Sequence, residues 1–104
     1  MNKIGVLGGT FDPPHGAHLE IARRSISQFG LNKVIFIPSG NPWQKKDSTS
    51  FLHRFEMTKI LINESEFFEI SDIEKSEENP SYTYETLLRL DHPKEDLYFI
   101  LGSD

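Results

Sequence analysis

Apolar residues along the chain fall into four short runs, each bounded by polar or turn-forming residues. The runs are rich in Val, Ile, Leu and Phe and do not alternate cleanly with polar residues. That pattern is typical of parallel strands that are covered by helices on both faces. It predicts strands at residues 3–7, 33–37, 67–71 and 97–101.

Three stretches between these runs have helical spacing. In the first, Leu19, Ala22, Ile26 and Phe29 fall on one stripe of a helix that begins near residue 16. Gly30 follows at the position where a helix end favours left-handed backbone, so the helix is predicted to stop there.

The second helical stretch runs from about residue 51 to residue 63, and Ser50 is its predicted N-cap. Its apolar side is predicted to consist of Phe51, Leu52, Phe55 and Ile62. The third stretch begins after Pro80 and Ser81, and its apolar residues are Tyr84, Leu87 and Leu88, with Glu85 in the favourable first turn.

The alternation of strand and helix predicts one α/β domain over residues 1–104, with a Rossmann-like parallel sheet and helices on both faces. Two longer loops, at 38–50 and 72–80, interrupt it, and the second is acidic. The chain stops after the fourth predicted strand, where another helix is expected to cover the sheet edge. We therefore expect residues 1–104 to be the N-terminal part of a larger domain.

Composition narrows the possible functions. The sequence has no cysteine, which excludes disulfides, thiolate nucleophiles and cysteine zinc sites. The net charge of −5 argues against a nucleic-acid partner, which usually requires a basic surface. No apolar run is long enough to cross a bilayer and no leader precedes the first strand, so we expect a cytoplasmic protein without a membrane partner.

The first strand-to-helix turn, residues 8–18, carries most of the chemical information. Gly8 and Gly9 allow a ligand to approach the backbone, because no Cβ stands in the way. The helix that begins near Gly16 directs N–H groups and the positive end of its dipole toward the same space, which suits a phosphate. His15 and His18 are three residues apart, so both imidazoles could face one spot and donate to phosphate oxygens.

Each part of this turn also has a simpler interpretation. Two glycines after a strand often form only a tight turn, and a histidine near a loop is commonly a surface residue. A metal site is disfavoured because no third ligand is close in sequence. The combination of strand, two glycines, Thr, two prolines and two spaced histidines favours phosphate chemistry.

These residues resemble the nucleotidyltransferase superfamily that carries a His-x-Gly-His signature. The resemblance implies that Thr10, His15 and His18 surround the triphosphate of ATP, and that the two histidines stabilise the phosphates during transfer. Gly8, Gly9 and Phe11 join the implied ATP-binding set. The usual glycine between the histidines is Ala17 here, which would bring a methyl group close to the nucleotide.

Within this superfamily, the run 34–42 resembles the second strand and loop of bacterial nicotinate-nucleotide adenylyltransferases. There a Pro-His-Lys segment typically follows, whereas this chain has Trp43, Gln44 and Lys45. The resemblance implies that Lys45 pairs with a phosphate as a third catalytic residue. From the sequence alone, Lys45 and Lys46 could equally be exposed loop charges.

Three further segments follow the order of that family. Arg54 and Met57 match its Arg-x-x-Met helix, although we favour a core-facing helix with one exposed arginine. The segment Ser81, Tyr82, Thr83 and Tyr84 is similar to one that presents backbone and hydroxyl groups to the nicotinate ring, while a capped helix start explains Ser81 equally well. Gly102 and Asp104 resemble a Gly-x-Asp turn near the adenosine ribose of ATP.

The resemblance covers the whole chain but about half of a typical family member. It implies transfer of AMP from ATP to nicotinate mononucleotide, which gives deamido-NAD and pyrophosphate, with Mg²⁺ bridging the phosphates rather than held by protein ligands. A homo-oligomer is compatible with the sequence, and the preference for nicotinate over nicotinamide is not determined by it.

Three alternatives stay open. One is a sister adenylyl- or cytidylyltransferase whose acceptor is phosphopantetheine or glycerol phosphate. Another is a nucleotide-binding module that binds ATP without turnover. The third, disfavoured by the acidic charge, is a fragment of a class I aminoacyl-tRNA synthetase.

Overall fold

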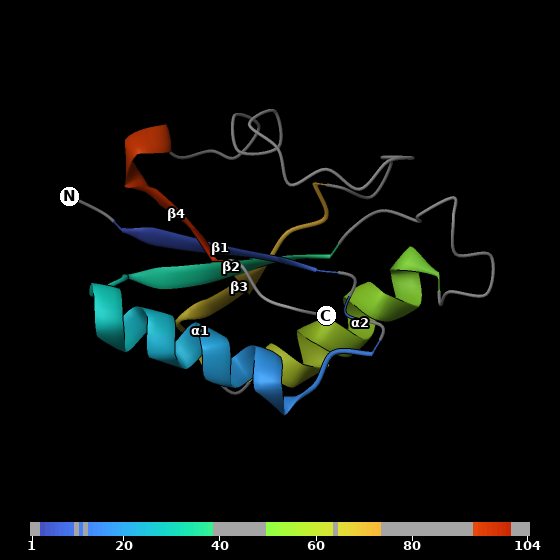
Figure 1. Ribbon diagram of the computed structural model, residues 1–104. Helices are drawn as coiled ribbons and strands as arrows, with labels where there is room; N and C mark the ends of the chain where they lie inside the picture. The colour runs from blue at the N-terminus through green and yellow to red at the C-terminus, as the bar shows by residue number, and fades with distance from the viewer. Residues whose placement is uncertain are drawn as a thin grey trace.

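The computed structural model describes residues 3–9, 11, 13–38, 50–63, 65–73 and 93–100. Strands and helices alternate along most of this length (Figure 1). In chain order the elements are β1 (Ile4–Gly9), α1 (Gly16–Phe29), β2 (Lys33–Pro38), α2 (Phe51–Ile62), β3 (Phe68–Ile70), the 3₁₀ helix η1 (Lys94–Asp96) and β4 (Leu97–Ile100).

All four predicted strands are present and join into one parallel sheet with the order β3-β2-β1-β4. β1 lies inside the sheet, because Ile4 is in register with Lys33 of β2 on one side and with Leu97 of β4 on the other. The ends of β1 and β2 coincide, since Gly9 is in register with Pro38. The α/β fold class predicted from the alternating pattern is therefore confirmed.

Alternate residues of the strands build two cores, one on each face of the sheet. On the first face, Leu7, Val34 and Phe36 pack with residues of α1 and α2. Both helices cover this face in Figure 1. On the opposite face, a second cluster contains Ile4, Val6, Ile35 and Ile37, with Leu97 of β4 packed against it. The predicted helix after Ser81 lies outside the described residues.

Helix α1 follows its predicted stripe except at its last residue. Leu19 and Ala22 are buried against the sheet and Ile26 is half-buried. Phe29 was predicted to share this stripe, but it is 52% exposed. The reason is its position in the final turn, where its ring borders a surface groove beside Tyr98 of β4 rather than the core.

The end of α1 has the predicted geometry. Gly30 adopts φ 66° and ψ 39°, which is left-handed backbone, and its N–H donates to the carbonyl of Ile26. Because side chains with a Cβ are strained in this region, glycine is the residue that ends the helix at lowest cost. The chain then turns directly into β2.

Helix α2 begins as predicted but buries a different face. The hydroxyl of Ser50 accepts a hydrogen bond from the N–H of His53 at 3.3 Å, so Ser50 is the N-cap. The apolar side was predicted to include Leu52, which is 61% exposed. Leu52 lies about 100° around the helix from Phe51, so both cannot face the sheet.

The preferred interpretation of Arg54 as a surface residue was wrong. The buried residues of α2 are Phe51, Arg54, Thr58 and Ile62, which are spaced by three or four positions and so form one stripe. Arg54 is 1% exposed, and its guanidinium carbon lies 5.7 Å from the centre of the Phe51 ring. Because the guanidinium is buried together with the stem, its charge is compensated by contacts within the protein rather than by water.

Polar contacts join segments that are distant in sequence. The N–H of Lys3 donates to Oδ1 of Asn32, and the N–H of Asn32 donates to the carbonyl of Lys3, both at 2.7 Å. Between β2 and β3, Lys33 Nζ lies 2.8 Å from a carboxylate oxygen of Glu69. In the part of the chain that the structure describes, neither helix has the length and apolarity needed to span a bilayer.

Candidate active site

The predicted phosphate-binding turn begins at the carboxyl end of β1. Gly8 and Gly9 are the last two residues of this strand, and Gly16 is the first residue of α1. Because β1 lies between β2 and β4, the turn leaves the middle of the sheet, where open α/β proteins bind their ligands. Pro14 lines an apolar groove of about 300 Å³ with Met57 and Leu61, so the segment before α1 lies against α2.

The first turn of α1 is closed by the two histidines themselves. His15 is the N-cap residue, and its Nδ1 accepts a hydrogen bond from the N–H of Ala17 at 3.3 Å. The N–H of His15 in turn donates to Nδ1 of His18 at 3.1 Å. This is a reciprocal capping box in which imidazoles occupy the positions usually taken by Ser or Thr and by Glu or Gln.

The capping bonds define the tautomer of each ring. In a neutral imidazole one nitrogen accepts and the other carries the proton. Since Nδ1 of both His15 and His18 accepts from a backbone N–H, the proton of each ring is on Nε2. Nε2 is thus the donor nitrogen of each ring; it belongs to an exposed side chain at His15, whereas at His18 the atom is buried.

The structure brings the two predicted catalytic histidines together. Their ring centroids are 4.3 Å apart, and the ring planes are inclined by 40°. His15 is exposed, whereas His18 is only 4% exposed. The pair therefore has one ring at the surface and a second ring beneath it.

Phe11 lies below this pair. Its ring is fully buried and meets the His18 ring in a T-shaped contact with the centroids 4.7 Å apart. Its backbone adopts φ 52°, a left-handed conformation that costs a residue with a Cβ about 1–2 kcal/mol. Phe11 was predicted to bind ATP, but its ring belongs to the core, so only its backbone could face a ligand.

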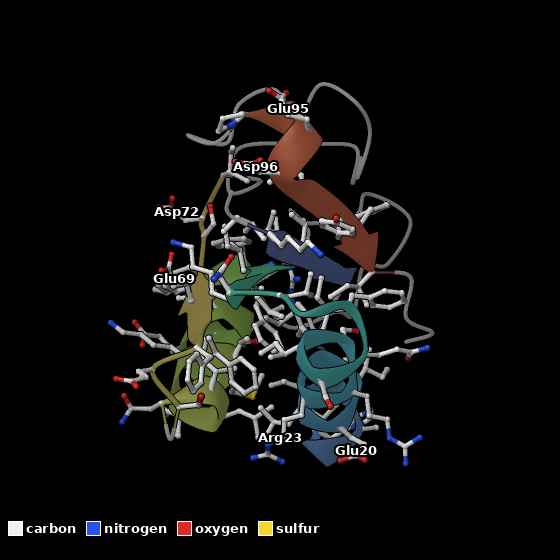
Figure 2. The ribbon with its side chains drawn as sticks, turned by 90° about the vertical axis from the view of Figure 1, so that its left-hand side faces the viewer. Glu20, Arg23, Glu69, Asp72, Glu95 and Asp96 are labelled. Carbon is white, nitrogen blue, oxygen red and sulfur yellow. The ribbon has the colours of Figure 1, made fainter. Side chains whose placement is uncertain are left out.

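The electrostatics at the start of α1 favour an anion. The first turn contains no acidic side chain that would neutralise the positive end of the helix dipole. Glu20, in the next turn, forms an ion pair with Arg24 at 2.7 Å on the exposed side of the helix. Figure 2 shows Glu20 pointing away from the sheet, while Glu95 and Asp96 lie on η1, across the sheet from α1 and α2.

The described residues contain no group of three His, Asp or Glu side chains that could hold a metal ion. The other predicted site residues lie outside the described part of the chain. They are Thr10, Lys45, Ser81, Tyr82, Thr83, Tyr84, Gly102 and Asp104.

Two features of the turn were not predicted from the sequence. The capping role of the histidines had a signal, because His15 and His18 have the spacing of N-cap and N3 in a capping box. The left-handed backbone of Phe11 had none, since a bulky residue is uncommon at positive φ.

Comparison with known proteins adds a family and a set of relatives. Residues 6–104 match the model of a family described as cytidylyltransferase-like. The chain is 47% identical to a probable nicotinate-nucleotide adenylyltransferase of Clostridium tetani and 43% identical to the nicotinate-nucleotide adenylyltransferase of Bacillus subtilis. Each alignment covers 100% of this chain, but only 54% and 57% of the relative. The chain thus spans about half the length of these curated relatives.

Solved structures show the same fold. The nicotinic acid mononucleotide adenylyltransferase of Plasmodium falciparum, complexed with NaAD, superposes with a TM-score of 0.70 at 24% identity. The match covers 95% of this chain and 50% of that chain. A second structure of that enzyme, complexed with APC, has a TM-score of 0.68 at 23% identity.

Proposed function

The chain belongs to the cytidylyltransferase-like family, and on that premise we propose that it acts in the transfer of AMP from ATP to nicotinate mononucleotide. This reaction yields deamido-NAD and pyrophosphate and belongs to NAD biosynthesis. We infer the acceptor, nicotinate mononucleotide, from the names of relatives that are 43–47% identical over the whole chain. The observation that carries the proposal is the pair of imidazoles, 4.3 Å apart, at the start of α1, whose first turn has no acidic side chain.

In the proposed reaction, a 5′-phosphate oxygen of nicotinate mononucleotide attacks the α-phosphorus of ATP. The new P–O bond forms as the bond between the α-phosphorus and the bridging oxygen breaks, and pyrophosphate leaves with that electron pair. No protein nucleophile is required, because phosphoryl and nucleotidyl transfer depend chiefly on positioning and on stabilisation of charge. This chain would supply both from the turn between β1 and α1.

We assign the donors to Nε2 of His15 and His18. Both rings carry their proton on Nε2 when Nδ1 caps the helix, so they can donate to phosphate oxygens without a prior change of tautomer. Gly8 and Gly9 would let the triphosphate approach the backbone at the end of β1. The helix dipole would add a fixed positive potential at the same place.

Part of the negative charge on the triphosphate would be neutralised by Mg²⁺. We assign its ligands to phosphate oxygens and water, the usual arrangement for Mg²⁺ bound with a phosphate substrate. Thr10, Lys45, Gly102 and Asp104 complete the proposed ATP site. Ser81, Tyr82, Thr83 and Tyr84 form the proposed site for the nicotinate nucleotide.

The test is release of pyrophosphate from ATP by the 104-residue chain with Mg²⁺. Nicotinate mononucleotide, its amide and phosphopantetheine are compared as acceptors. We expect release with the nicotinate nucleotide, and we expect it to fall in His18→Ala by about 100-fold or more, the effect of removing one donor to a developing charge. His53→Ala is the matched control, because His53 is an exposed histidine on α2 and should be silent.

The other outcomes separate the alternatives. Release with phosphopantetheine alone would replace the proposal with a sister transferase. Binding of ATP without release for any acceptor would show that this chain is a nucleotide-binding module and contradict turnover by residues 1–104 alone.

A further inference from the structure

Three phenylalanines and one histidine form a row of ring contacts that crosses the core. Phe68 of β3 meets Phe36 of β2 in a T-shaped contact at 5.4 Å. Phe36 meets Phe11 at 5.9 Å, and Phe11 meets His18 at 4.7 Å. The row therefore connects β3, an edge strand of the sheet, to the imidazole pair at the start of α1.

Phe11 is the member of this row with an unusual backbone. It is the only non-glycine residue at positive φ in the part of the chain that the structure describes. A bulky residue keeps such a conformation only where its surroundings hold it, and such residues concentrate at functional sites. What holds Phe11 is the complete burial of its ring between Phe36 and His18.

His18 is consequently held on two sides. Its Nδ1 accepts the N–H of His15, which fixes one edge of the ring. The T-shaped contact with Phe11, at an interplanar angle of 73°, restricts rotation of the ring about the Cβ–Cγ bond. A half-turn about that bond would exchange Nδ1 with a carbon and break the capping bond to His15.

We propose that Phe11 is a positioning residue for His18: its buried ring holds the imidazole in the orientation in which Nδ1 caps α1 and Nε2 carries the proton. Because the ring is fully buried, this role acts through His18 rather than through contact of the ring with the nucleotide. The effect on turnover rests on the proposed function, but the effect on His18 does not.

The test is the Phe11→Leu variant of the full 104-residue chain, because leucine fills much of the space but offers no ring edge. Long-range ¹H–¹⁵N NMR reports which imidazole nitrogen carries the proton. The chain has four histidines, so His15→Gln, His53→Gln and His92→Gln variants together assign the His18 signals. We expect wild-type His18 to be a single Nε2–H tautomer. In Phe11→Leu its two nitrogen signals should move toward the average of exchanging tautomers.

Phe68→Leu is the matched control. It removes a ring from the same row that is three contacts away from His18, so it should weaken the core and leave the His18 tautomer unchanged. Phe11→Met serves as a second variant if leucine prevents folding, since the flexible thioether adapts to irregular space. An unchanged His18 tautomer in the folded Phe11 variant, or an equal shift in Phe68→Leu, would overturn the proposal.

Turnover adds a second readout. With ATP and nicotinate mononucleotide, we expect kcat of Phe11→Leu to fall by about 10- to 100-fold, because small misplacement of a catalytic group has effects of that order. KM for ATP should change much less, since the backbone of the turn is retained. If the wild-type chain shows no turnover, the proposed function fails while the NMR comparison still decides the role of Phe11.

Discussion

The N–H of His15 lies 3.1 Å from Nδ1 of His18 and donates to it, which commits one nitrogen of His18 to closing the first turn of α1. His15 is committed in the same way through the N–H of Ala17. Each imidazole thus has a structural nitrogen and a nitrogen that carries the proton. Substitutions that mimic only one of these nitrogens can therefore distinguish the contribution to folding stability from the contribution to catalysis.

His15→Asn should keep the N-cap hydrogen bond of α1 and lose most of the catalytic activity. The amide oxygen of asparagine can replace Nδ1, and asparagine is among the preferred N-cap residues, so the free energy of unfolding should stay within about 0.5 kcal/mol of wild type. The Nε2 donor is lost, so pyrophosphate release should fall by about 10- to 100-fold. Urea unfolding and the acceptor assay measure the two effects on the same sample.

His15→Gln is the counterpart. Its longer side chain places an amide nitrogen near the position of Nε2 but no acceptor at the position of Nδ1. The free energy of unfolding should fall by about 1 kcal/mol, and activity should exceed that of His15→Asn. Equal loss of stability in both variants would contradict the capping role of Nδ1.

Gly5→Ala should destabilise the centre of the sheet. A Cβ at this position would lie 2.8 Å from Cδ1 of Leu31 and 2.9 Å from Cδ1 of Ile100, which is closer than packed carbons approach. Because both atoms are the ends of flexible side chains that can shift, the cost should lie at the low end of the range for overpacking, about 1 kcal/mol, measurable by urea unfolding. Gly16→Ala is the matched control, because nothing lies within 4 Å of its added Cβ. Its stability should be unchanged or higher.

Arg54→Ala should cost far more stability than a surface arginine does. The side chain is fully buried and its guanidinium lies over the Phe51 ring, so truncation leaves a cavity in the α2 core and should lower the free energy of unfolding by about 2–4 kcal/mol. Arg24→Ala removes only an exposed ion pair with Glu20 and should cost less than about 0.5 kcal/mol. Similar values for both would show that Arg54 is not a core residue.

Gly30→Ala should shorten or strain the end of α1. Alanine at φ 66° costs about 1–2 kcal/mol, even though nothing lies within 4 Å of the added Cβ. Gly30→Asn should be milder, because asparagine tolerates left-handed backbone better than alanine. Thermal unfolding of the two variants should therefore rank glycine first, asparagine second and alanine last.

Local signals were sufficient for the order of the strands and of α1 and α2 along the chain, for the end of α1 and for the start of α2. The apolar runs predicted every described strand, and Gly30 and Ser50 have strong local preferences for the positions they occupy. The juxtaposition of His15 and His18 was also predictable, because three-residue spacing at a helix start determines it.

Burial was less predictable, because it depends on where each helix lies on the sheet. Leu52 and Phe29 are apolar yet exposed, while Arg54 is charged yet buried. Periodicity alone places these residues on a stripe but does not say which stripe meets the strands. The conformation of Phe11 depends on the same tertiary packing, since its buried ring compensates for an unfavourable backbone.

The reciprocal bonds between Lys3 and Asn32 bear on the order in which the chain folds. They close a loop of 29 residues around α1, whereas β4 must pair with β1 across most of the sequence, as Ile4 with Leu97. Closing the longer loop costs about 1 kcal/mol more entropy, and non-local pairing is slow. We expect the β1–α1–β2 unit to serve as the folding nucleus. Because this unit is synthesised before β4, the histidine cap would already be assembled on a nascent chain when β4 leaves the ribosome.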